Sequence, residues 1–381
     1  MTRTLFWISL LFILYTYAGY PALLHFWSIL LPKKVRKKPL AEAPLVSVVL
    51  AARNEERNIA RRIENLLDQD YPADSMEIIV VSDGSTDATD SIVGALVEGR
   101  GKAAPSLRHI PLENNRGKPG ALNAGIAAAA GEYIIFADAR QQFEPDAISR
   151  LVENFSDHGV GAVSGELVFH ADSGTAIRAD MGLYWDLEKW IRKTESRIHS
   201  TAGATGAIYA ARKELVPPLP PDVILDDVMI PMRIVLRGYR TVFETGAVAW
   251  DTVSRDHTHE KRRKVRTLFG NYQLLRMMPG LLSPRKNPIF LQFLSHKIFR
   301  LFVPLFFILM MASALAAGGA AYTIFFAAAL AAVLLPLIEK PLAGIPLMRK
   351  ACSFSRTFTS LNYFAFLAFL MLFKPGRREV W

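Results

Sequence analysis

The chain has 381 residues, 51% of them hydrophobic, and its formal net charge is +10. This length accommodates a full catalytic domain together with membrane segments. The long apolar runs exclude a soluble nucleic-acid-binding protein, so attraction to anionic lipid or to a phosphate-rich substrate explains the charge better. The single cysteine, Cys352, excludes an intrachain disulfide and suits a reducing cytoplasmic face.

The first predicted element is a membrane anchor. Leu5 to Leu31 is almost free of charge, and its length fits a span of about 20 residues or a longer tilted one. Basic residues follow directly, at Lys33, Lys34, Arg36, Lys37 and Lys38. The positive-inside rule therefore places the next segment in the cytoplasm. Because no small-residue cleavage motif follows, we expect residues 1–32 to be a retained anchor, with a cleaved or interfacial segment as the alternative.

Residues 44–275 are predicted to form one domain, in which strands and helices alternate. The predicted strands are Leu45–Ala51, Met76–Val81, Leu107–Pro111 and Glu132–Ala137, and the helices between them are Asn58–Asp68, Thr86–Leu96 and Gly120–Ala130. Alternation at this spacing predicts βαβ units and a mostly parallel sheet. The apolar run that ends at Ala137 is typical of a strand buried on both faces.

Polar residues follow each of these four strands, and the main candidates are Glu55, Asp83, Lys118 and Asp138. In open α/β sheets, ligands bind beyond the carboxyl ends of the strands. A single Asp-Gly-Ser sequence is an ordinary turn and helix cap, but four polar strand ends facing one edge indicate a ligand site. A carboxylate at Asp83 suits hydrogen bonding to a base or ribose, and Lys118 offers a point charge for phosphate.

Two later segments carry further candidate residues. A small-residue loop with Gly203, Thr205 and Gly206 precedes a strand predicted over Ile208–Ala211, and small residues permit close backbone approach. An amphipathic helix over Ala176–Ser200 contains Trp185. That helix is either ordinary core or membrane-interface packing or a surface that faces an acceptor or lipid.

A pair of carboxylates, Asp226 and Asp227, precedes a helix predicted over Val228–Arg237, which Gly238 ends. Paired carboxylates at a helix start also have an ordinary reading, as cap and dipole partners. A carboxylate in such a place can also act as a general base in catalysis.

Residues 280–381 are predicted to form an interfacial helix and C-terminal membrane helices. The candidate spans are Ile298–Ala317, Tyr322–Ile338 and Phe354–Phe373. Three spans would leave the basic residues Lys374, Arg377 and Arg378 outside, against the positive-inside rule. One re-entrant or interfacial segment would remove the conflict.

The segments Val46–Asp87, Asn115–Gly125 and Tyr133–Asp138 resemble the nucleotide-binding half of the family 2 glycosyltransferases, which have the GT-A fold. The resemblance continues through Asp226-Asp227 and Gly238-Tyr239-Arg240 to about Asn271. It implies an inverting transferase that uses a nucleotide-activated sugar.

Carried over position by position, the resemblance assigns roles to the candidate residues. It makes Glu55 and Asp83 contacts to the nucleoside and puts Lys118 near the base or diphosphate. Asp138 becomes the first Asp of an Asp-x-Asp motif that contacts ribose and metal. Asp227 becomes the catalytic base with Asp226 in support, and the loop with Gly203, Thr205 and Gly206 lies beside the acceptor, where Trp185 is also expected.

Arg140 stands where the second Asp of the motif is expected. In one account, Mn²⁺ or Mg²⁺ is still bound, through Asp138, diphosphate oxygens, water and Gln142, a position where some dolichol-phosphate sugar synthases of the family use a Gln. In another, Arg140 pairs with the diphosphate and reduces the need for metal. In a third, Arg140 is an uninvolved surface side chain. We favour the retained metal.

The strongly basic segment from Arg255 to Arg266 is a second departure. Processive polysaccharide synthases of the family carry Gln-x-x-Arg-Trp, and this chain aligns there as Arg263-Lys264-Val265-Arg266-Thr267. The Arg is kept, so Arg266 is expected to meet the diphosphate leaving group unless the segment only contacts anionic lipid. The Trp is absent, which removes a stacking surface for a sugar acceptor and puts processivity in doubt.

The sequence therefore predicts an α/β protein in which a GT-A (Rossmann-like) domain is flanked by transmembrane helices. The expected activity is transfer of a sugar from a nucleotide-diphosphate sugar, with UDP favoured, to a lipid-linked or glycan acceptor at the cytoplasmic face of the inner (plasma) membrane. The alternatives are a processive polysaccharide synthase that exports its product and an inactive sugar-nucleotide-binding scaffold. A transporter is disfavoured because the spans are nearly free of polar residues. Expected partners are the nucleotide sugar, the acceptor and membrane lipids, without nucleic acid; a homo-oligomer stays open.

Overall fold

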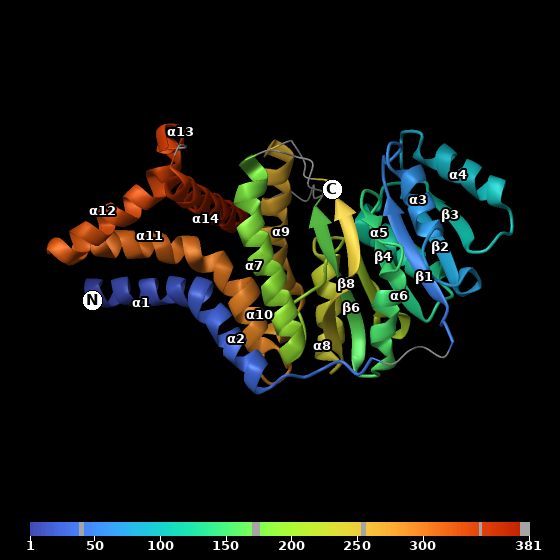
Figure 1. The fold of residues 1–381 in the computed structure, drawn as a ribbon, viewed down its shortest axis with the longest axis horizontal. Coiled ribbons are helices and arrows are strands. Elements are labelled where there is room, and N and C mark those ends of the chain that lie inside the picture. The colour runs from blue at the N-terminus through green and yellow to red at the C-terminus, as the bar shows by residue number, and fades with distance from the viewer. Residues whose placement is uncertain (38–41, 170–175, 253–256, 343–344, 374–381) are drawn as a thin grey trace.

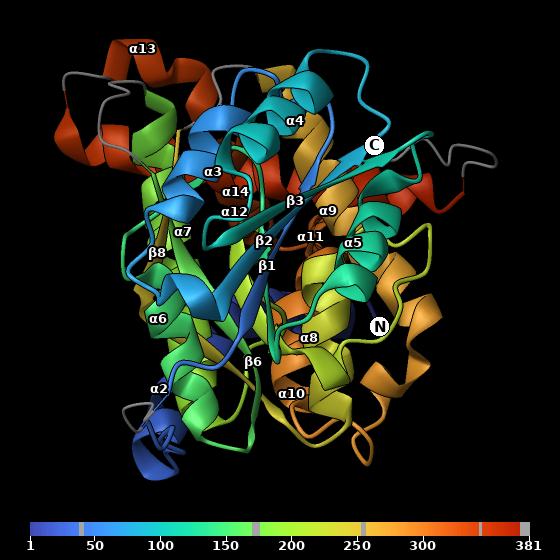
Figure 2. The same cartoon turned by 90° about the vertical axis from the view of Figure 1, so that its right-hand side faces the viewer.

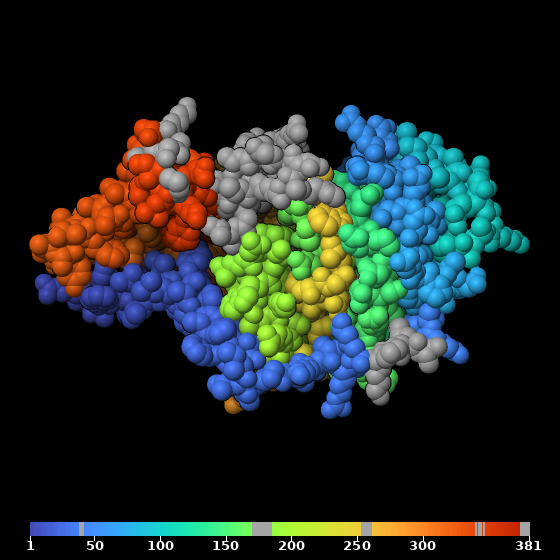
Figure 3. All heavy atoms as spheres, viewed as in Figure 1, coloured from blue at the N-terminus to red at the C-terminus, as the bar shows by residue number. Residues whose placement is uncertain are grey.

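The computed structural model describes residues 1–37, 42–169, 176–252, 257–342 and 345–373. An α/β domain and a group of apolar helices lie side by side (Figure 1). Two long helices, α7 (Ala176–Ile198) and α9 (His257–Met277), stand between them. In the space-filling view, the apolar helices project from the broader α/β domain, with the N-terminal helix along one side of the projection (Figure 3).

The α/β domain is built on one eight-stranded sheet with the order β3-β2-β1-β4-β7-β6-β8-β5. Its strands are β1 (Val46–Ala52), β2 (Met76–Asp83), β3 (Ser106–Leu112), β4 (Tyr133–Ala137), β5 (Gln142–Phe143), β6 (Val160–Phe169), β7 (Ile208–Arg212) and β8 (Arg240–Asp251). The first four strands are parallel, and so are β6 and β8. β7 runs antiparallel to both of its neighbours, and β5 is antiparallel to β8. The predicted mostly parallel α/β sheet is therefore confirmed.

Helices cover both faces of the sheet (Figure 2). One face carries α3 (Ile59–Leu67), α4 (Thr89–Arg100) and α6 (Ala147–Val152), and the other carries α5 (Gly117–Ala128) and α8 (Asp226–Leu236). Side chains along each strand alternate between the two cores: Val48 faces the α3 side and Val49 the α5 side, both fully buried. Full burial of each such side chain contributes about 1.5–3 kcal/mol to folding. This two-sided burial explains why the strands read as continuous apolar runs.

Two of the apolar segments are continuous helices long enough to cross a membrane, one near the N-terminus and one at Phe290–Ala317. The first of these helices consists of α1 (Thr2–Leu14), the π-helical turn η1 (Tyr15–Gly19) and α2 (Tyr20–Leu30). The second consists of α10 (Phe290–Phe293), the π-helical turn η6 (Leu294–Ile298) and α11 (Phe299–Ala317). They are followed by α12 (Ala320–Leu334), η7 (Leu335–Ile338), α13 (Glu339–Leu342) and α14 (Pro346–Met371). Gly318 and Gly319 have φ angles of 63° and 93°, which makes the turn between α11 and α12.

Within the described residues, three helices are long and apolar enough to cross a membrane: Thr2–Leu30, Phe290–Ala317 and Ala320–Ile338. The predicted span Phe354–Phe373 is not among them. Its helix α14 begins earlier and contains Arg349, Lys350 and Arg356, and it packs against α7, α9 and α11. The expectation of one re-entrant or interfacial segment stays a prediction, since Lys374, Arg377 and Arg378 lie outside the described residues.

Short turns complete the chain: η2 (Ala73–Ser75), η3 (Glu153–Ser156), η4 (Lys213–Leu215) and η5 (Pro279–Leu282). Two predicted boundaries move in a way that matters for the site. Lys118 is the second residue of α5, which begins three residues before the predicted helix, and Asp226 and Asp227 form the first turn of α8. Both helices therefore present polar residues at their N-terminal ends, where the positive end of the helix dipole lies.

Candidate active site

The sheet topology brings the polar strand ends together. Because β1 to β4 are parallel, the segments after each of them lie along one edge of the sheet. β7 is antiparallel to β4, with Ile208 opposite Ala137, so the loop 201–207 that precedes β7 lies at the same edge. The edge therefore gathers the expected donor residues and the expected acceptor loop.

The loops after β1 and β2 are held together by hydrogen bonds. Asn54 adopts a left-handed backbone with φ 54°, and its Oδ1 accepts the Thr86 N–H at 2.8 Å. The Glu55 N–H donates to Thr89 Oγ1 at 2.8 Å, and its carboxylate accepts from Asn58 Nδ2 at 2.8 Å. Glu55 is thus half-buried and fixed at the edge, as a nucleoside contact requires.

Asp83 ends β2 and is almost fully buried, with 1% of its surface exposed. Its Oδ1 accepts the Arg116 N–H at 2.7 Å, while its Oδ2 is buried and has no hydrogen-bond partner within the described part of the chain. A buried acceptor without a donor costs about 1–3 kcal/mol. A ligand N–H or O–H at this place would satisfy it, which suits the predicted role of Asp83 toward a nucleoside.

Lys118 connects Asp138, after β4, to the carboxylate pair of α8. Its Nζ lies 2.9 Å from Asp138 Oδ1 and 3.7 Å from Asp226 Oδ2. Burial lowers the pKa of Lys118, but the carboxylates of Asp138 and Asp226 outweigh that effect and raise it above its ordinary value. Lys118 is therefore a permanent cation that bridges the end of β4 and the start of α8.

The two carboxylates of α8 have different surroundings. Asp226 is buried and faces Lys118, whereas Asp227 is partly exposed at the edge. Burial and the adjacent carboxylate of Asp226 raise the pKa of Asp227 to about 6, against the pull of the cations Lys118, Lys297 and Arg192. A carboxylate whose pKa is raised toward neutrality is a better proton acceptor in catalysis.

The loop 201–207 packs directly against Asp227. The Ala204 N–H donates to the Asp227 carbonyl at 2.7 Å, and a Cβ on Gly206 would lie 3.0 Å from Asp227 Oδ2. Gly203 has φ 120°, a conformation that favours glycine. Thr205 is buried and its Oγ1 accepts a hydrogen bond from Arg192.

Trp185 lies apart from this loop, on the strand β6 side. Its indole N–H donates to the Leu167 carbonyl at 3.2 Å, and its ring is tilted against Phe169 at a centroid distance of 5.5 Å. The side chain is thus anchored on the strand end and half-buried. Its predicted contact to an acceptor stays a prediction.

Arg140 is held by a residue that the sequence analysis did not single out. Its guanidinium lies 3.1 Å from Asp251 Oδ2, at the end of β8, and Gln141 Nε2 donates to the same oxygen at 2.7 Å. Asp251 is buried, while the Arg140 side chain remains 47% exposed. The Arg140 guanidinium is therefore oriented by Asp251, while much of the side chain stays accessible to solvent. The signal was present, since Asp251 ends an apolar strand just as Asp138 follows one.

Arg266 lies on α9 near the carboxylate pair. Burial lowers the pKa of Arg266, and the charges of Asp226 and Asp227 oppose that shift. The side chain is half-buried, and a guanidinium stays charged in either case. The other end of the predicted basic segment, Arg255, lies outside the described residues.

A divalent metal ion is implied by the fold, and the donor set fits one only if a substrate contributes ligands. Within the described residues, no three His, Cys, Asp or Glu side chains lie close enough to hold a metal by themselves. Asp138 keeps 36% of its side chain exposed at the edge, and Gln142 in β5 is partly exposed. Mg²⁺ and Mn²⁺ sites of one or two protein oxygens with substrate phosphates and water are common.

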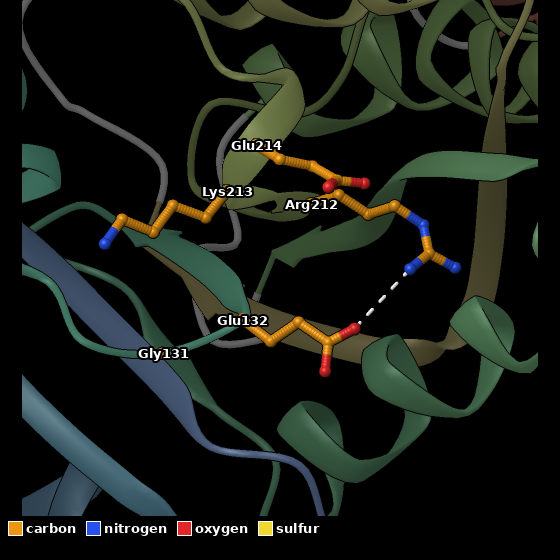
Figure 4. A pocket seen from close by; sticks show the side chains of 5 residues that line it. All are labelled: Gly131, Glu132, Arg212, Lys213 and Glu214. Carbon is orange, nitrogen blue, oxygen red and sulfur yellow. Dashed lines mark ion pairs between the residues drawn. The ribbon is translucent and has the colours of Figure 1, made fainter.

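A separate hollow of about 540 Å³ lies at the opposite edge of the sheet, lined by Gly131, Glu132, Arg212, Lys213 and Glu214 (Figure 4). Glu132 directly precedes β4 and Arg212 ends β7. Their ion pair, at 3.6 Å, spans the hollow. None of the candidate residues Glu55, Asp83, Lys118 and Asp138 lines this hollow, so it is not the candidate active site.

Comparison with known proteins agrees with this geometry. Residues 47–216 match the model of the glycosyl transferase family 2. The chain is 27% identical over 265 residues to a poly-β-1,6-N-acetyl-D-glucosamine synthase of Staphylococcus aureus (strain COL), covering 68% of this chain and 63% of that protein. A synthase of the same name from Staphylococcus epidermidis is 26% identical over 234 residues, with 60% of this chain and 55% of that one covered. The match thus spans less than two thirds of the length of these relatives.

A solved structure shares the whole architecture. The mannosyltransferase PcManGT of Pyrobaculum calidifontis, in complex with GDP-Man and Mn²⁺, superimposes with a TM-score of 0.75 at 24% identity. The match covers 98% of this chain and 100% of that chain, the apolar helices included. It shows that both chains have the same fold.

Proposed function

We propose that the chain is a glycosyltransferase that transfers one sugar from a nucleotide-diphosphate sugar to a lipid-linked or glycan acceptor, with inversion at the anomeric carbon. The match of residues 47–216 to the glycosyl transferase family 2 model supports this. The reaction takes place at the cytoplasmic face of the plasma membrane. The observation that carries the proposal is that Lys118 joins Asp138, at the donor edge, to Asp226, beside the base Asp227.

The donor nucleotide is bound along the strand ends. Asp83 Oδ2 is buried and has no partner within the described residues, and it accepts a hydrogen bond from the nucleobase. Glu55 contacts the nucleoside. The diphosphate brings negative charge to an edge that already holds the carboxylates of Asp138, Asp226 and Asp227. Lys118, Arg140 and Arg266 are the cations that offset it, with Arg140 oriented by Asp251 and Arg266 beside the leaving group.

Asp227 removes the proton of the acceptor hydroxyl. That hydroxyl lies against the loop 201–207 and attacks the anomeric carbon from the side opposite the diphosphate. The bond between the hydroxyl oxygen and the anomeric carbon forms as the bond to the diphosphate oxygen breaks, which inverts the configuration. General-base assistance of this kind contributes about 10²–10⁴-fold in rate. The raised pKa of Asp227 favours proton uptake, and Asp226 keeps Lys118 in place.

We further propose that Mn²⁺ or Mg²⁺ is held by Asp138 and Gln142 together with the diphosphate. When bound, the ion supplies positive charge that stabilises the leaving group. The second position of the motif, Arg140, serves the same diphosphate as a fixed cation. The fold-sharing mannosyltransferase is described with Mn²⁺, which supports testing this ion first.

The donor sugar to test first is N-acetylglucosamine, as its UDP derivative, because the staphylococcal relatives are named as synthases of an N-acetylglucosamine polymer. The same names support a second candidate function, processive polymer synthesis. Against it stands Thr267, which follows Arg266 where the processive synthases have Trp.

The experiment is a product analysis with purified full-length protein in detergent. The protein is incubated with a panel of UDP- and GDP-sugars and with membrane lipids, with and without Mn²⁺, and the products are weighed by mass spectrometry. Single-sugar transfer predicts a lipid heavier by one sugar residue. A ladder of products would instead establish the processive alternative, and binding of donor without any transfer or hydrolysis would establish the scaffold alternative.

A further inference from the structure

A cluster of buried ionisable side chains lies where the membrane-length helices meet the catalytic domain. It comprises Glu188 and Glu195 on α7, His296 on η6, Arg300 on α11 and Tyr20 on α2. His296 is 2% exposed, Glu188 7%, and Glu195 and Tyr20 are fully buried. Removing ions from water costs several kcal/mol for each one unless partners compensate. The cost of burying these groups suggests that the cluster has a function in addition to packing.

The contacts of His296 define its state. Its Nδ1 lies 2.9 Å from Glu195 Oε1, and its Nε2 lies 2.8 Å from Glu188 Oε1. An ionised carboxylate only accepts hydrogen bonds, and both ring nitrogens donate only in the imidazolium. Burial raises the pKa of Glu188, but His296, Arg300 and Arg192 outweigh burial and hold that pKa well below its usual range. His296 therefore lies between two carboxylates, with each ring nitrogen within hydrogen-bond distance of one of them.

Glu188 connects His296 to Arg192, which lies nearer to the candidate active site. Its Oε2 accepts from Arg300 at 2.7 Å, and its Oε1 lies 3.5 Å from Nε of Arg192, one helical turn further along α7. Arg192 NH1 then donates to Thr205 Oγ1 at 2.8 Å. Thr205 lies in the loop 201–207, whose Ala204 N–H donates to the Asp227 carbonyl.

The Thr205 end of this path is also fixed from the sheet. The Thr205 N–H donates to Ser164 Oγ at 2.9 Å, in the middle of β6. Gly206, the next residue, approaches Asp227 so closely that a Cβ there would lie 3.0 Å from Asp227 Oδ2. A shift of Thr205 would therefore change the position of the loop backbone that packs against Asp227.

We propose that His296 is a positioning residue for the acceptor loop: through Glu188 and Arg192, it holds Thr205 and with it the backbone that packs against Asp227. The membrane-length helix Phe290–Ala317 is thereby part of the catalytic machinery and not only an anchor. The proposal rests on the proposed function, because it names what aligns acceptor and base. Misplacement by about 1 Å at a reacting group can reduce the rate about 100-fold.

The test is a double-mutant cycle on kcat with full-length protein. His296→Gln keeps one hydrogen bond but cannot bridge Glu188 and Glu195 as the ring does, and Thr205→Val keeps the shape but removes the hydroxyl. Each single variant is expected to lower kcat about 10-fold or more while nucleotide affinity changes by less than about two-fold. In the Thr205→Val background, His296→Gln is expected to cause less than about a further two-fold loss, because residues on one path are not additive.

Two further variants separate positioning from simple structural support. Tyr20→Phe removes the hydrogen bond to Glu195, which lies in the same cluster but off the path to Arg192, and should keep kcat within about two-fold of the wild type. Thr205→Ser restores the hydroxyl and should recover kcat. If His296→Gln does not fold, Glu188→Gln, which keeps the side-chain size, replaces it in the same cycle.

The outcomes distinguish this inference from the proposed function. Losses that multiply in the double variant, or a His296→Gln effect no larger than that of Tyr20→Phe, would overturn the positioning role while wild-type transfer remains intact. A wild-type protein that transfers no sugar from any donor would overturn the proposed function itself.

Discussion

Lys118 and Asp138 form an ion pair, with Nζ 2.9 Å from Oδ1, although 20 residues separate them in the chain. Lys118 comes from the first turn of α5 and Asp138 from the end of β4, and the ammonium reaches Asp226 at 3.7 Å on its other side. One cation thus joins the edge expected to hold the donor to the helix that carries the expected base. The predictions below depend on this arrangement.

Replacing the base should abolish turnover but not donor binding. Asp227→Asn keeps the size of the side chain and removes its ability to accept a proton, so kcat should fall about 10²–10⁴-fold. Nucleotide affinity, measured by calorimetry, should stay within about three-fold, since the expected contacts to the nucleoside are Glu55 and Asp83. Asp222→Asn, an exposed carboxylate shortly before the pair, is the control. Near-normal turnover by Asp227→Asn would contradict the assignment.

The activity should follow the titration of Asp227. Because its pKa is raised to about 6, the base is protonated below that pH and ionised above it. The rate of transfer at saturating substrate should therefore rise with pH up to about 6 and then level off. A rate that does not change between pH 5 and pH 8 would speak against Asp227 as the base.

The same raised pKa makes a prediction about stability. The folded protein holds the Asp227 proton more tightly than the unfolded chain, whose carboxyl has the ordinary pKa of 3.8. Protonation thus favours folding, and this contribution is lost as pH rises from about 4 to about 6. Asp227→Asn removes the loss, so its melting temperature should exceed that of the wild type by more at pH 8 than at pH 4. An equal difference at both pH values would exclude the raised pKa.

Removing the bridging cation should affect both binding and stability. Lys118→Met leaves Asp138 and the buried Asp226 without their shared partner, and breaking a buried ion pair from one side costs about 3–5 kcal/mol. Because Lys118 is 20% exposed, the loss in the free energy of unfolding should lie at or below the lower figure. Donor affinity should fall as well. Lys102→Met, at an exposed position, should change neither quantity in denaturant and binding titrations.

Arg140 should depend on Asp251 for its effect on the donor. Asp251→Asn weakens the ion pair that orients the guanidinium, so the KM for the donor should rise with little change in kcat. Arg140→Ala should raise KM too, and the double variant should resemble Arg140→Ala alone, since the two residues act as one unit. Asp74→Asn, at an exposed position distant in sequence from both Arg140 and Asp251, is the matched control. Independent, multiplying effects would show that Asp251 serves another purpose.

Metal removal tests whether a divalent ion takes part in the reaction. Stripping the protein with excess chelator should lower transfer at least about 10-fold, and Mn²⁺ or Mg²⁺ should restore it. Gln142→Leu should raise the metal concentration needed for half-maximal activity, because an oxygen ligand is lost. Full activity in chelator would mean that Lys118, Arg140 and Arg266 neutralise the diphosphate without an ion.

Local sequence determined much of this protein. The alternating apolar runs gave the strands of the first half and the helices between them, because period and burial are local properties of the chain. The polar residues after those strands, Glu55, Asp83, Lys118 and Asp138, could be predicted to share an edge because parallel strands end together. The apolar run at each end of the chain likewise needed only its length and composition.

Only the tertiary structure decided which distant side chains meet. β5 pairs with β8 across a long sequence separation, with Gln142 opposite Trp250, and that pairing brings Asp251 to Arg140. The meeting of His296, Glu188 and Arg192 likewise depends on how a membrane-length helix packs on α7. Buried ion pairs form where packing excludes water from both partners at once, and no periodicity in a single segment encodes that coincidence.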